Sequence, residues 1–359
     1  MGQAVGLLAV GVHVCRQVMK STNKPVPSGN NYKKGVPGSG KGQARVIICA
    51  NDYRKTAQPL SCTMDGRNME KLLMACNVKD KTFLYDDQCT IENVTRVIKE
   101  VGARCEEDDY FVFYFSGHGV SVPDENGDED DGLDEAFVFV DRYGRISRAT
   151  CMLDDDFARI MTDALPKGLR VAILTDCCHS GTIADFENPA WDSFEAFSIA
   201  GCLDGQTSGD IGKGGIFTHS MLMALDALQR DSLEEYSVGM LFNGTIAFDE
   251  RVFRSAQDIT IQTNRGCAPD TIAWPLVPQS VYLSPLSQAR YAGRSLGQAL
   301  PPGTPGGAAA VLQSNPMIMQ QLGVGPEVVA LASANLGADV DIEDVVDDEV
   351  PGRQNCAVM

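Results

Sequence analysis

The sequence has no apolar run close to the about 20 residues that crossing a bilayer requires, so we expect no membrane-spanning helix. The apolar stretch from Gly2 to Val14 is too short for a secretory signal, and no cationic region precedes it. The twelve cysteines include no Cys-x-x-Cys pair, which argues against a disulfide framework and against a zinc site of four thiolates. We therefore predict a cytoplasmic protein in which most thiols are buried apolar groups.

Positive charge is also scarce. Thirty Lys and Arg stand against 48 Asp and Glu, which gives a net charge of −18. A nucleic-acid partner is not expected, because affinity for nucleic acid depends on cations that neutralise phosphates. A positively charged substrate suits this negative net charge better than a nucleic acid does. With 44% hydrophobic residues in 359, the chain has enough apolar material for a large core.

The first 43 residues differ in composition from the central part of the chain. They carry six Lys or Arg, no Asp or Glu, and many Gly, Pro, Ser and Asn, so we predict a flexible basic arm over residues 1–43. Gly35 to Lys41 contains most of a phosphate-binding loop. Position 42 is Gly rather than Ser or Thr, and no strand precedes the motif, so we interpret it as linker.

From Arg45 onward, short β-branched or aromatic runs alternate with helical patterns, which predicts an α/β fold with a mostly parallel sheet covered by helices on both faces. The predicted strands are 46–50, 82–85, 110–115, 136–140, 171–175, 196–202 and 259–263. The predicted helices are 65–76, 90–104, 154–165, 217–229 and a stretch near 246–256. After about residue 285 the composition changes to Pro, Gly, Ala and Gln, so we predict a folded unit over 44–284 and a disordered tail over 285–359.

Residues of the types that act in catalysis follow two of the predicted strands. In open parallel sheets, ligands bind beyond the carboxyl ends of the strands. His118, flanked by two glycines, follows the run 110–115, and Cys177 and Cys178 follow the run 171–175. A cysteine nucleophile needs an imidazole nearby. Of the four histidines, His118 is the best candidate, because His13 lies in the arm, His219 fits a helical pattern and the side chain of His179 should diverge from its neighbour Cys178.

These residues resemble a known family. The sequence Phe-Ser-Gly-His-Gly at 115–119, followed by Asp-Cys-Cys-His-Ser-Gly at 176–181, resembles the catalytic pair of the metacaspases, which are caspase-fold cysteine peptidases. The similarity covers about residues 45–284 and includes Asp-Gly-Leu-Asp-Glu at 131–135, Asp-Asp-Asp at 154–156 and Gly-Cys-Leu-Asp-Gly-Gln-Thr-Ser at 201–208. It implies the caspase-like fold, with a large segment over 44–193 and a small segment over 194–284 joined almost without a linker, as in type I members.

The resemblance implies roles for single residues. Cys178 is the expected nucleophile and His118 the acid and base, while Cys177 occupies a position where relatives often have Ser. We expect the backbone N–H groups of Gly119 and Cys178 to hold the oxyanion. No third residue that orients His118 is evident in the sequence.

The resemblance also places Cys62, Asp65, Ser116 and Asp176 around the pocket for the substrate residue before the scissile bond. Two carboxylates there favour a guanidinium or ammonium group, so we predict cleavage after Arg or Lys. Simpler roles stay open: Asp65 suits a helix N-cap, and Asp176 suits a turn.

The acidic stretch 124–135 suggests an ion site, although it is not an EF-hand, since Glu129 stands where that loop requires Gly. A solvated acidic loop is the simpler interpretation. Metacaspase calcium ligands correspond to Asp134, Asp154, Asp155 and Asp185, so the resemblance implies activation, not catalysis, by Ca²⁺. Asp154 and Asp155 also suit a helix cap.

The termini suggest lipidation. Cys356-Ala-Val-Met fits a prenylation box, and Gly2 and Cys15 are weaker acylation candidates, so we predict possible membrane association of a cytoplasmic protein. The family further implies a monomeric zymogen that cleaves itself, with a role in programmed cell death. Candidate self-cleavage sites are Lys33, Lys34, Lys41 and Lys213. The alternative function is a catalytically idle caspase-fold scaffold tethered to membrane.

Overall fold

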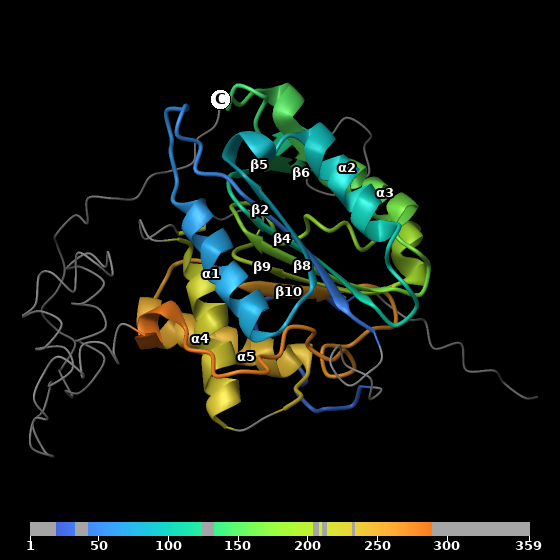
Figure 1. The fold of residues 1–359 in the computed structure, drawn as a ribbon, viewed down its shortest axis with the longest axis vertical. Coiled ribbons are helices and arrows are strands. Elements are labelled where there is room, and N and C mark those ends of the chain that lie inside the picture. The colour runs from blue at the N-terminus through green and yellow to red at the C-terminus, as the bar shows by residue number, and fades with distance from the viewer. Residues whose placement is uncertain are drawn as a thin grey trace, which may run out of the picture.

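Ten β-strands form two sheets in the part of the chain that the structure, a computed structural model, describes. The described residues are 19–32, 42–123, 133–203, 208–209, 214–231 and 234–288. The larger sheet has seven strands. Their order is β1 (Met19–Thr22), β10 (Thr260–Thr263), β9 (Glu195–Ala200), β8 (Arg170–Asp176), β4 (Tyr110–Ser116), β2 (Ala44–Ala50) and β3 (Asp80–Tyr85). The central strands β2, β4 and β8 lie side by side in Figure 1.

The five strands from β9 to β3 are parallel, as the alternation of strands and helices predicted. Their register aligns the carboxyl ends: Ser116 pairs with both Asp176 and Ala50, and Ala50 pairs with Tyr85. The residues that follow these four positions therefore lie in one row along the carboxyl edge of the sheet. This row determines where the functional groups lie.

Helices cover both faces of this sheet (Figure 1). On one face lie α1 (Cys62–Ala75), α4 (Ile216–Arg230) and α5 (Val238–Phe248), and on the other α2 (Ile91–Gly102) and α3 (Asp154–Ala164). Every residue of β4 is buried. Its tyrosines pack in the cluster with α1, α4 and α5, and its phenylalanines pack in the cluster with α2 and α3. A central strand that is apolar throughout therefore supplies both halves of the core.

The smaller sheet corrects one prediction. The run 136–140 was expected among the strands of the parallel sheet, but β6 (Leu133–Val138) pairs antiparallel with β5 (Gly119–Pro123) and β7 (Cys151–Leu153). Parallel neighbours need a crossover of a dozen or more residues, and only the segment between residues 123 and 133 joins β5 to β6. The smaller sheet continues directly from the residue after His118.

Residues 19–32 correct a second prediction, because they are not a free arm. Strand β1 pairs antiparallel with β10, with Met19 opposite Thr263 and Thr22 opposite Ile261. Composition rich in Gly, Pro and Asn did not indicate this strand, since its pairing depends on a partner about 240 residues away. The remaining residues of the predicted arm, 1–18 and 33–41, and the predicted tail from 289 lie outside the described residues.

The remaining elements are short. They are the 3₁₀-helices η1 (Asp86–Gln88), η2 (Arg148–Thr150) and η3 (Pro189–Ser193), and a π-helix, η4 (Asp249–Phe253). The helical stretch predicted near 246–256 thus begins earlier, at Val238, and ends in η4. No helix in the described segments combines the length and apolarity that crossing a membrane would need.

Candidate active site

His118 and Cys178 follow neighbouring parallel strands at the same depth. Each lies two residues beyond the paired residues Ser116 and Asp176, which end β4 and β8. Both side chains belong to residues that are nearly buried, with 2% and 4% of their surface exposed. The two residues line one small cleft, whose other lining residues are Leu60, Cys62, Ser116, Gly117, Asp176, Ser208, Gly209 and Gly215. The structure therefore brings the predicted catalytic pair to one cleft.

The His118 ring is held on two sides. Its Nε2 lies 2.8 Å from the carbonyl oxygen of Gln58, and its backbone N–H donates to the Tyr53 hydroxyl over 2.9 Å. The rings of Tyr53 and His118 are 4.3 Å apart. Because a carbonyl can only accept, the proton of the neutral imidazole belongs on Nε2, which leaves Nδ1 as the basic nitrogen.

Sequence analysis found no group that orients His118. The structure assigns this position to the Gln58 backbone carbonyl, which any residue type could supply. Tyr53 is the second group that sequence analysis missed. It is buried, its hydroxyl donates to the Val138 carbonyl, and burial raises the pKa of Tyr53 well above its usual value. Tyr53 is therefore a neutral hydrogen-bonding group that supports the His118 backbone.

The Cys178 sulfur accepts a hydrogen bond from the backbone N–H of Ser208 over 3.3 Å. An N–H directed at sulfur stabilises negative charge there. Cys177, by contrast, packs in the apolar cluster with α2 and α3, on the side of the sheet away from α1 and α4. His179 adopts a positive φ of 49°, and its Nδ1 lies 3.1 Å from the Ser121 hydroxyl. The chain thus presents Cys178, and not its two neighbours, to the cleft.

The four residues predicted around the substrate pocket also meet here. Asp65 is fully buried in the first turn of α1, and Asp176 is the last residue of β8. The Ser116 hydroxyl donates to Asp65 over 2.9 Å, while Cys62 and Ser116 line the cleft. Ser61, not Asp65, is the N-cap of α1, so the simpler role proposed for Asp65 is wrong.

The two carboxylates are held by neutral donors. Asp65 accepts the Gly215 N–H at 3.0 and 2.9 Å. Asp176 accepts the N–H and hydroxyl of Thr218 at 2.9 and 2.7 Å and the Ser208 hydroxyl at 2.8 Å. Each of these donors is a neutral group. The predicted role of Asp176 as a turn former is therefore incomplete, because its carboxylate also accepts the hydrogen bonds from Thr218 and Ser208.

Tyr114 lies close to both carboxylates. Its hydroxyl lies 2.6 Å from the Thr218 hydroxyl. Burial raises the pKa of Tyr114 well above its usual value, and the negative charges of Asp65 and Asp176 raise it further. Sequence analysis missed Thr218 and Gly215, which lie in and just before the apolar pattern of α4. No local signal marks them, because their partners are more than 40 residues away.

Two glycines let the chain approach these carboxylates. A side chain at Gly215 would overlap the Asp176 carboxylate. Gly214 has a φ of +110°, and a side chain there would overlap the Asp65 carboxylate. Gly119 makes a similar approach to the Cys178 carbonyl. Its proposed role in the oxyanion site, with the Cys178 N–H, stays a prediction.

The four aspartates predicted to bind calcium lie on adjoining segments. Asp134 belongs to β6, and Leu153 of β7 lies opposite Ala136 of β6, so Asp154 and Asp155 follow close to Asp134. The turn containing Asp185 is tied to β6, since the Thr182 hydroxyl donates to Glu135 over 2.8 Å and the Asp185 N–H donates to the Thr182 carbonyl. Leu153 is the N-cap of α3, so neither Asp154 nor Asp155 takes the capping position.

All four groups offer oxygen donors, which suit calcium, and Asp134 and Asp154 are buried. Within the described ranges, no three His, Cys, Asp or Glu side chains already have the arrangement of a metal site. The residues 124–132 lie outside those ranges. The donor set therefore fits calcium by chemistry and position, and its closure around an ion stays a prediction.

Several predicted positions cannot be placed. Cys356, Gly2 and Cys15, the lipidation candidates, and the self-cleavage candidates Lys33, Lys34, Lys41 and Lys213 lie outside the described residues. These stay predictions. Mass spectrometry of the termini of protein isolated from cells would test the lipid modifications.

Known proteins match the same part of the chain. Residues 29–187 match the family described as the metacaspase, peptidase C14 domain. Metacaspase-2 of Arabidopsis thaliana is 29% identical over 253 residues, which cover 59% of this chain and 58% of the relative. Metacaspase-1 of Yarrowia lipolytica is 28% identical over 287 residues, covering 58% and 61%. The chain thus spans about three fifths of the length of these relatives. Among solved structures, caspase-1 from Spodoptera frugiperda is 14% identical, with a TM-score of 0.47, over 72% of this chain and 98% of that one.

Proposed function

We propose that this chain is a metacaspase, a caspase-fold cysteine peptidase, and that it acts as an endopeptidase that cleaves after Arg or Lys. One observation carries the proposal: His118 and Cys178 line a cleft that also reaches Asp176 and Ser116, and Ser116 is bonded to the buried Asp65. A nucleophile, a base and a negatively charged pocket thus lie within one small space.

In the proposed reaction, the Cys178 thiolate attacks the carbonyl carbon of the scissile peptide. The tetrahedral oxyanion is held by the backbone N–H groups of Gly119 and Cys178. As the C–N bond breaks, the imidazolium of His118 gives its Nδ1 proton to the departing amine, and a thioester remains on Cys178. His118 then removes a proton from water, which hydrolyses the thioester and restores the thiol. The Gln58 carbonyl keeps the proton on Nε2, so that Nδ1 serves in both steps.

Charge supports the proposed specificity. A guanidinium or ammonium group entering the cleft would approach Asp176 and, beyond Ser116, Asp65, whose hydrogen bonds to neutral donors leave their charge in place. An aspartate side chain would meet two like charges instead. In a buried site this repulsion is much stronger than in water. We therefore propose a preference for Arg and Lys over Asp.

The activity test uses fluorogenic peptides that end in Arg, Lys or Asp. Wild-type protein should release the fluorophore after Arg and Lys, and Cys178→Ala should reduce the rate by at least about a thousandfold. Cys177→Ala is the matched control and should retain activity, because Cys177 packs in the core cluster. Turnover that survives in Cys178→Ala, or no turnover by wild type in any condition, would contradict the proposed function. A preference for Asp would contradict the pocket argument alone.

We further propose that calcium activates the enzyme by drawing together Asp134, Asp154, Asp155 and Asp185. When bound, the ion would neutralise carboxylates that otherwise repel one another. Asp134 lies in the smaller sheet, Asp154 and Asp155 begin α3 directly after that sheet, and Asp185 lies in the loop after Cys178. Ordering them would therefore act on the segments that carry His118 and Cys178.

The calcium test compares two neighbouring aspartates. Asp155→Asn should lose most of the calcium-stimulated activity. Asp156→Asn, which alters an exposed residue paired with Arg159, should keep it. The measurement is the rate on the Arg substrate over a calcium titration, with a chelator as reference. Full activity of Asp155→Asn in the presence of chelator would remove the calcium proposal and leave the peptidase proposal intact.

A further inference from the structure

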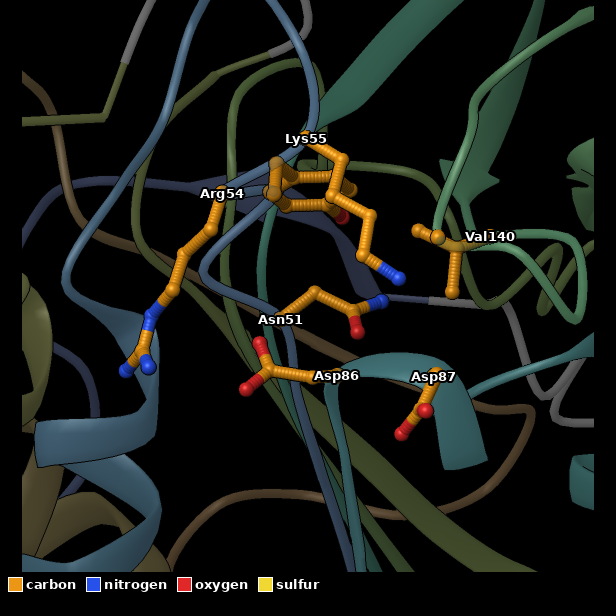
Figure 2. Close-up of a pocket in the computed structure, with 8 residues that line it drawn as sticks. Asn51, Arg54, Lys55, Asp86, Asp87 and Val140 are labelled. Carbon is orange, nitrogen blue, oxygen red and sulfur yellow. The ribbon is translucent and has the colours of Figure 1, made fainter.

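A second pocket lies beside the catalytic cleft, at the ends of β2 and β3. It has a volume of about 220 Å³ and is lined by residues that include Asn51, Tyr53, Lys55, Asp86 and Asp87 (Figure 2). Asn51 and Asp86 come directly after Ala50 and Tyr85, in the row of strand ends from which His118 and Cys178 also arise. Across the sheet the order is Cys178, His118, Asn51 and Asp86.

The Asn51 side chain is the unexplained group in this pocket. The residue is fully buried, and neither its Oδ1 nor its Nδ2 has a hydrogen-bond partner of ordinary geometry among the described residues, although the amide lies close enough to the Tyr53 hydroxyl to interact with it. Buried amides are nearly always paired, because an unmet donor or acceptor loses its hydration without compensation. Figure 2 shows the Asn51 amide and the Lys55 ammonium reaching into the same space, with Asp86 and Asp87 on its other side. A ligand with both a donor and an acceptor would satisfy this amide.

The charges around Asn51 restrict what that ligand is. A carboxylate would meet Asp86 and Asp87, and an ammonium or guanidinium would meet Lys55. Arg54 is already paired with Asp52. Lys55 donates one hydrogen bond to the Tyr143 carbonyl, over 3.0 Å, and its ammonium has two more protons. A carboxamide suits both sides, since its oxygen accepts from Lys55 or Asn51 and its NH₂ donates to Asn51 or a carboxylate.

In the proposed peptidase reaction, the substrate peptide runs from the catalytic cleft toward this second pocket. The acyl part of the substrate stays on Cys178, and the amine leaves on the side of His118. Beyond His118 lie β2 and β3, about 5 and 10 Å away at the usual strand spacing. An extended peptide covers about 3.3–3.6 Å per residue, so the second or third residue after the scissile bond reaches the pocket. Tyr53 separates the two sites, with its ring against His118 and its side chain in the pocket wall.

We propose that this pocket binds a Gln or Asn side chain located two or three residues after the scissile bond of the substrate. The proposal rests on the proposed peptidase function and adds a second determinant of substrate choice. Cleavage after a basic residue would then be fastest where a carboxamide follows on the other side of the cut.

The test uses internally quenched peptides with Arg before the cut that differ only at the second or third residue after it, where they carry Gln, Glu, Lys or Leu. Wild-type protein should show a kcat/KM for Gln about tenfold above Leu, as one or two buried hydrogen bonds predict. In Asn51→Leu this ratio should fall close to one, and in Lys55→Met it should fall in part. Lys99→Met, an exposed lysine on α2, is the matched control and should keep the wild-type ratio.

Because each ratio compares two substrates on the same protein, a general loss of activity in a variant cancels. Equal rates for Gln and Leu in wild type, faster cleavage with Glu or Lys, or an unchanged ratio in both Asn51→Leu and Lys55→Met would overturn the proposal. The inference is separable from the proposed function. If no peptide is cleaved, the same peptides are titrated into Cys178→Ala protein, where tighter binding of the Gln peptide than of the Leu peptide supports the pocket assignment, and equal binding overturns it.

Discussion

At the scale of single residues, two glycines control the charged end of the cleft. Gly214 has positive φ and lies against the Asp65 carboxylate, and Gly215 lies against Asp176 and donates its N–H to Asp65. Only a residue without a side chain allows this approach. The proposed pocket for a basic substrate residue therefore depends on the backbone of Gly214 and Gly215 as much as on the two carboxylates.

We expect Gly214→Ala to lower kcat/KM on the Arg substrate by at least about tenfold, because the new methyl group displaces either Asp65 or the loop that carries Gly215. Gly168→Ala is the matched control. Gly168 also has positive φ, at +84°, but nothing lies within 4 Å of a side chain placed there. Both variants should lose about 1 kcal/mol of stability through backbone strain, and only Gly214→Ala should lose activity. Equal activities of the two variants would contradict this account.

The surroundings of His118, the proposed catalytic histidine, show which parts of the site the sequence could not predict. His118 and Cys178 were predictable candidates, because strand exits can be located from apolar runs and only four histidines are present. The Gln58 carbonyl that holds Nε2 was not predictable, since a backbone group leaves no trace in residue type. The same holds for the Ser208 N–H at the Cys178 sulfur, which depends on the path of a loop.

At the scale of secondary structure, local patterns located most elements but not all of their partners. The runs that became β2, β4 and β8 are apolar on both faces, which in a sequence of this length indicates central parallel strands. The run that became β6 is equally apolar and was wrongly assigned to the same sheet. Apolar character reports burial, and the choice of neighbour is made by chain connections and tertiary packing.

The π-helix η4 carries a buried acid. Asp249 accepts a hydrogen bond from the Ser255 hydroxyl over 2.9 Å, while its Oδ1 has no partner among the described residues. Burial raises the pKa of Asp249 to about 6, and the nearby charges of Glu250 and Asp258 act in the same direction. Because this pKa lies above the value near 4 of an unfolded chain, the folded state binds the extra proton between about pH 4 and 6. Stability should therefore fall as pH rises through that window.

We expect Asp249→Asn to remove this loss of stability at higher pH. At pH 7.5 the variant should be more stable than wild type by about 1–2 kcal/mol, and at pH 4 the two should be nearly equal. The measurement is urea unfolding at a series of pH values, and the informative quantity is the difference between variant and wild type. Asp231→Asn, at the exposed end of α4, should show no such trend. A difference that is constant from pH 4 to 7.5 would contradict the assignment to Asp249.

At the scale of the whole molecule, the first described residues, 19–32, pair with elements from the last third of the described chain. Residues 19–32 add β1 to the sheet edge at β10 and then cross to α5. Asn243 of α5 accepts the N–H of Val26 and donates to its carbonyl, both over 2.9 Å, and Asn30 accepts the Ser237 N–H. This segment therefore packs at the edge of the sheet on the face that carries α4 and α5. Helix α4 in turn holds Asp176 through Thr218.

Asn243→Ala should release this segment. Loss of both hydrogen bonds to Val26 should lower the free energy of unfolding by about 1–3 kcal/mol, because the Val26 backbone groups are left half-buried without partners. Asn93→Ala in α2 is the matched control: its amide also makes two hydrogen bonds, to the Gln88 carbonyl and from Arg96, but both are exposed to solvent, so the change should be less than about 0.5 kcal/mol. Limited trypsin digestion in native buffer should cut Asn243→Ala faster after Lys20, in β1, than wild type or Asn93→Ala, which separates local release from global unfolding. Equal rates of cleavage after Lys20 in all three proteins would show that Asn243 does not hold the segment in place.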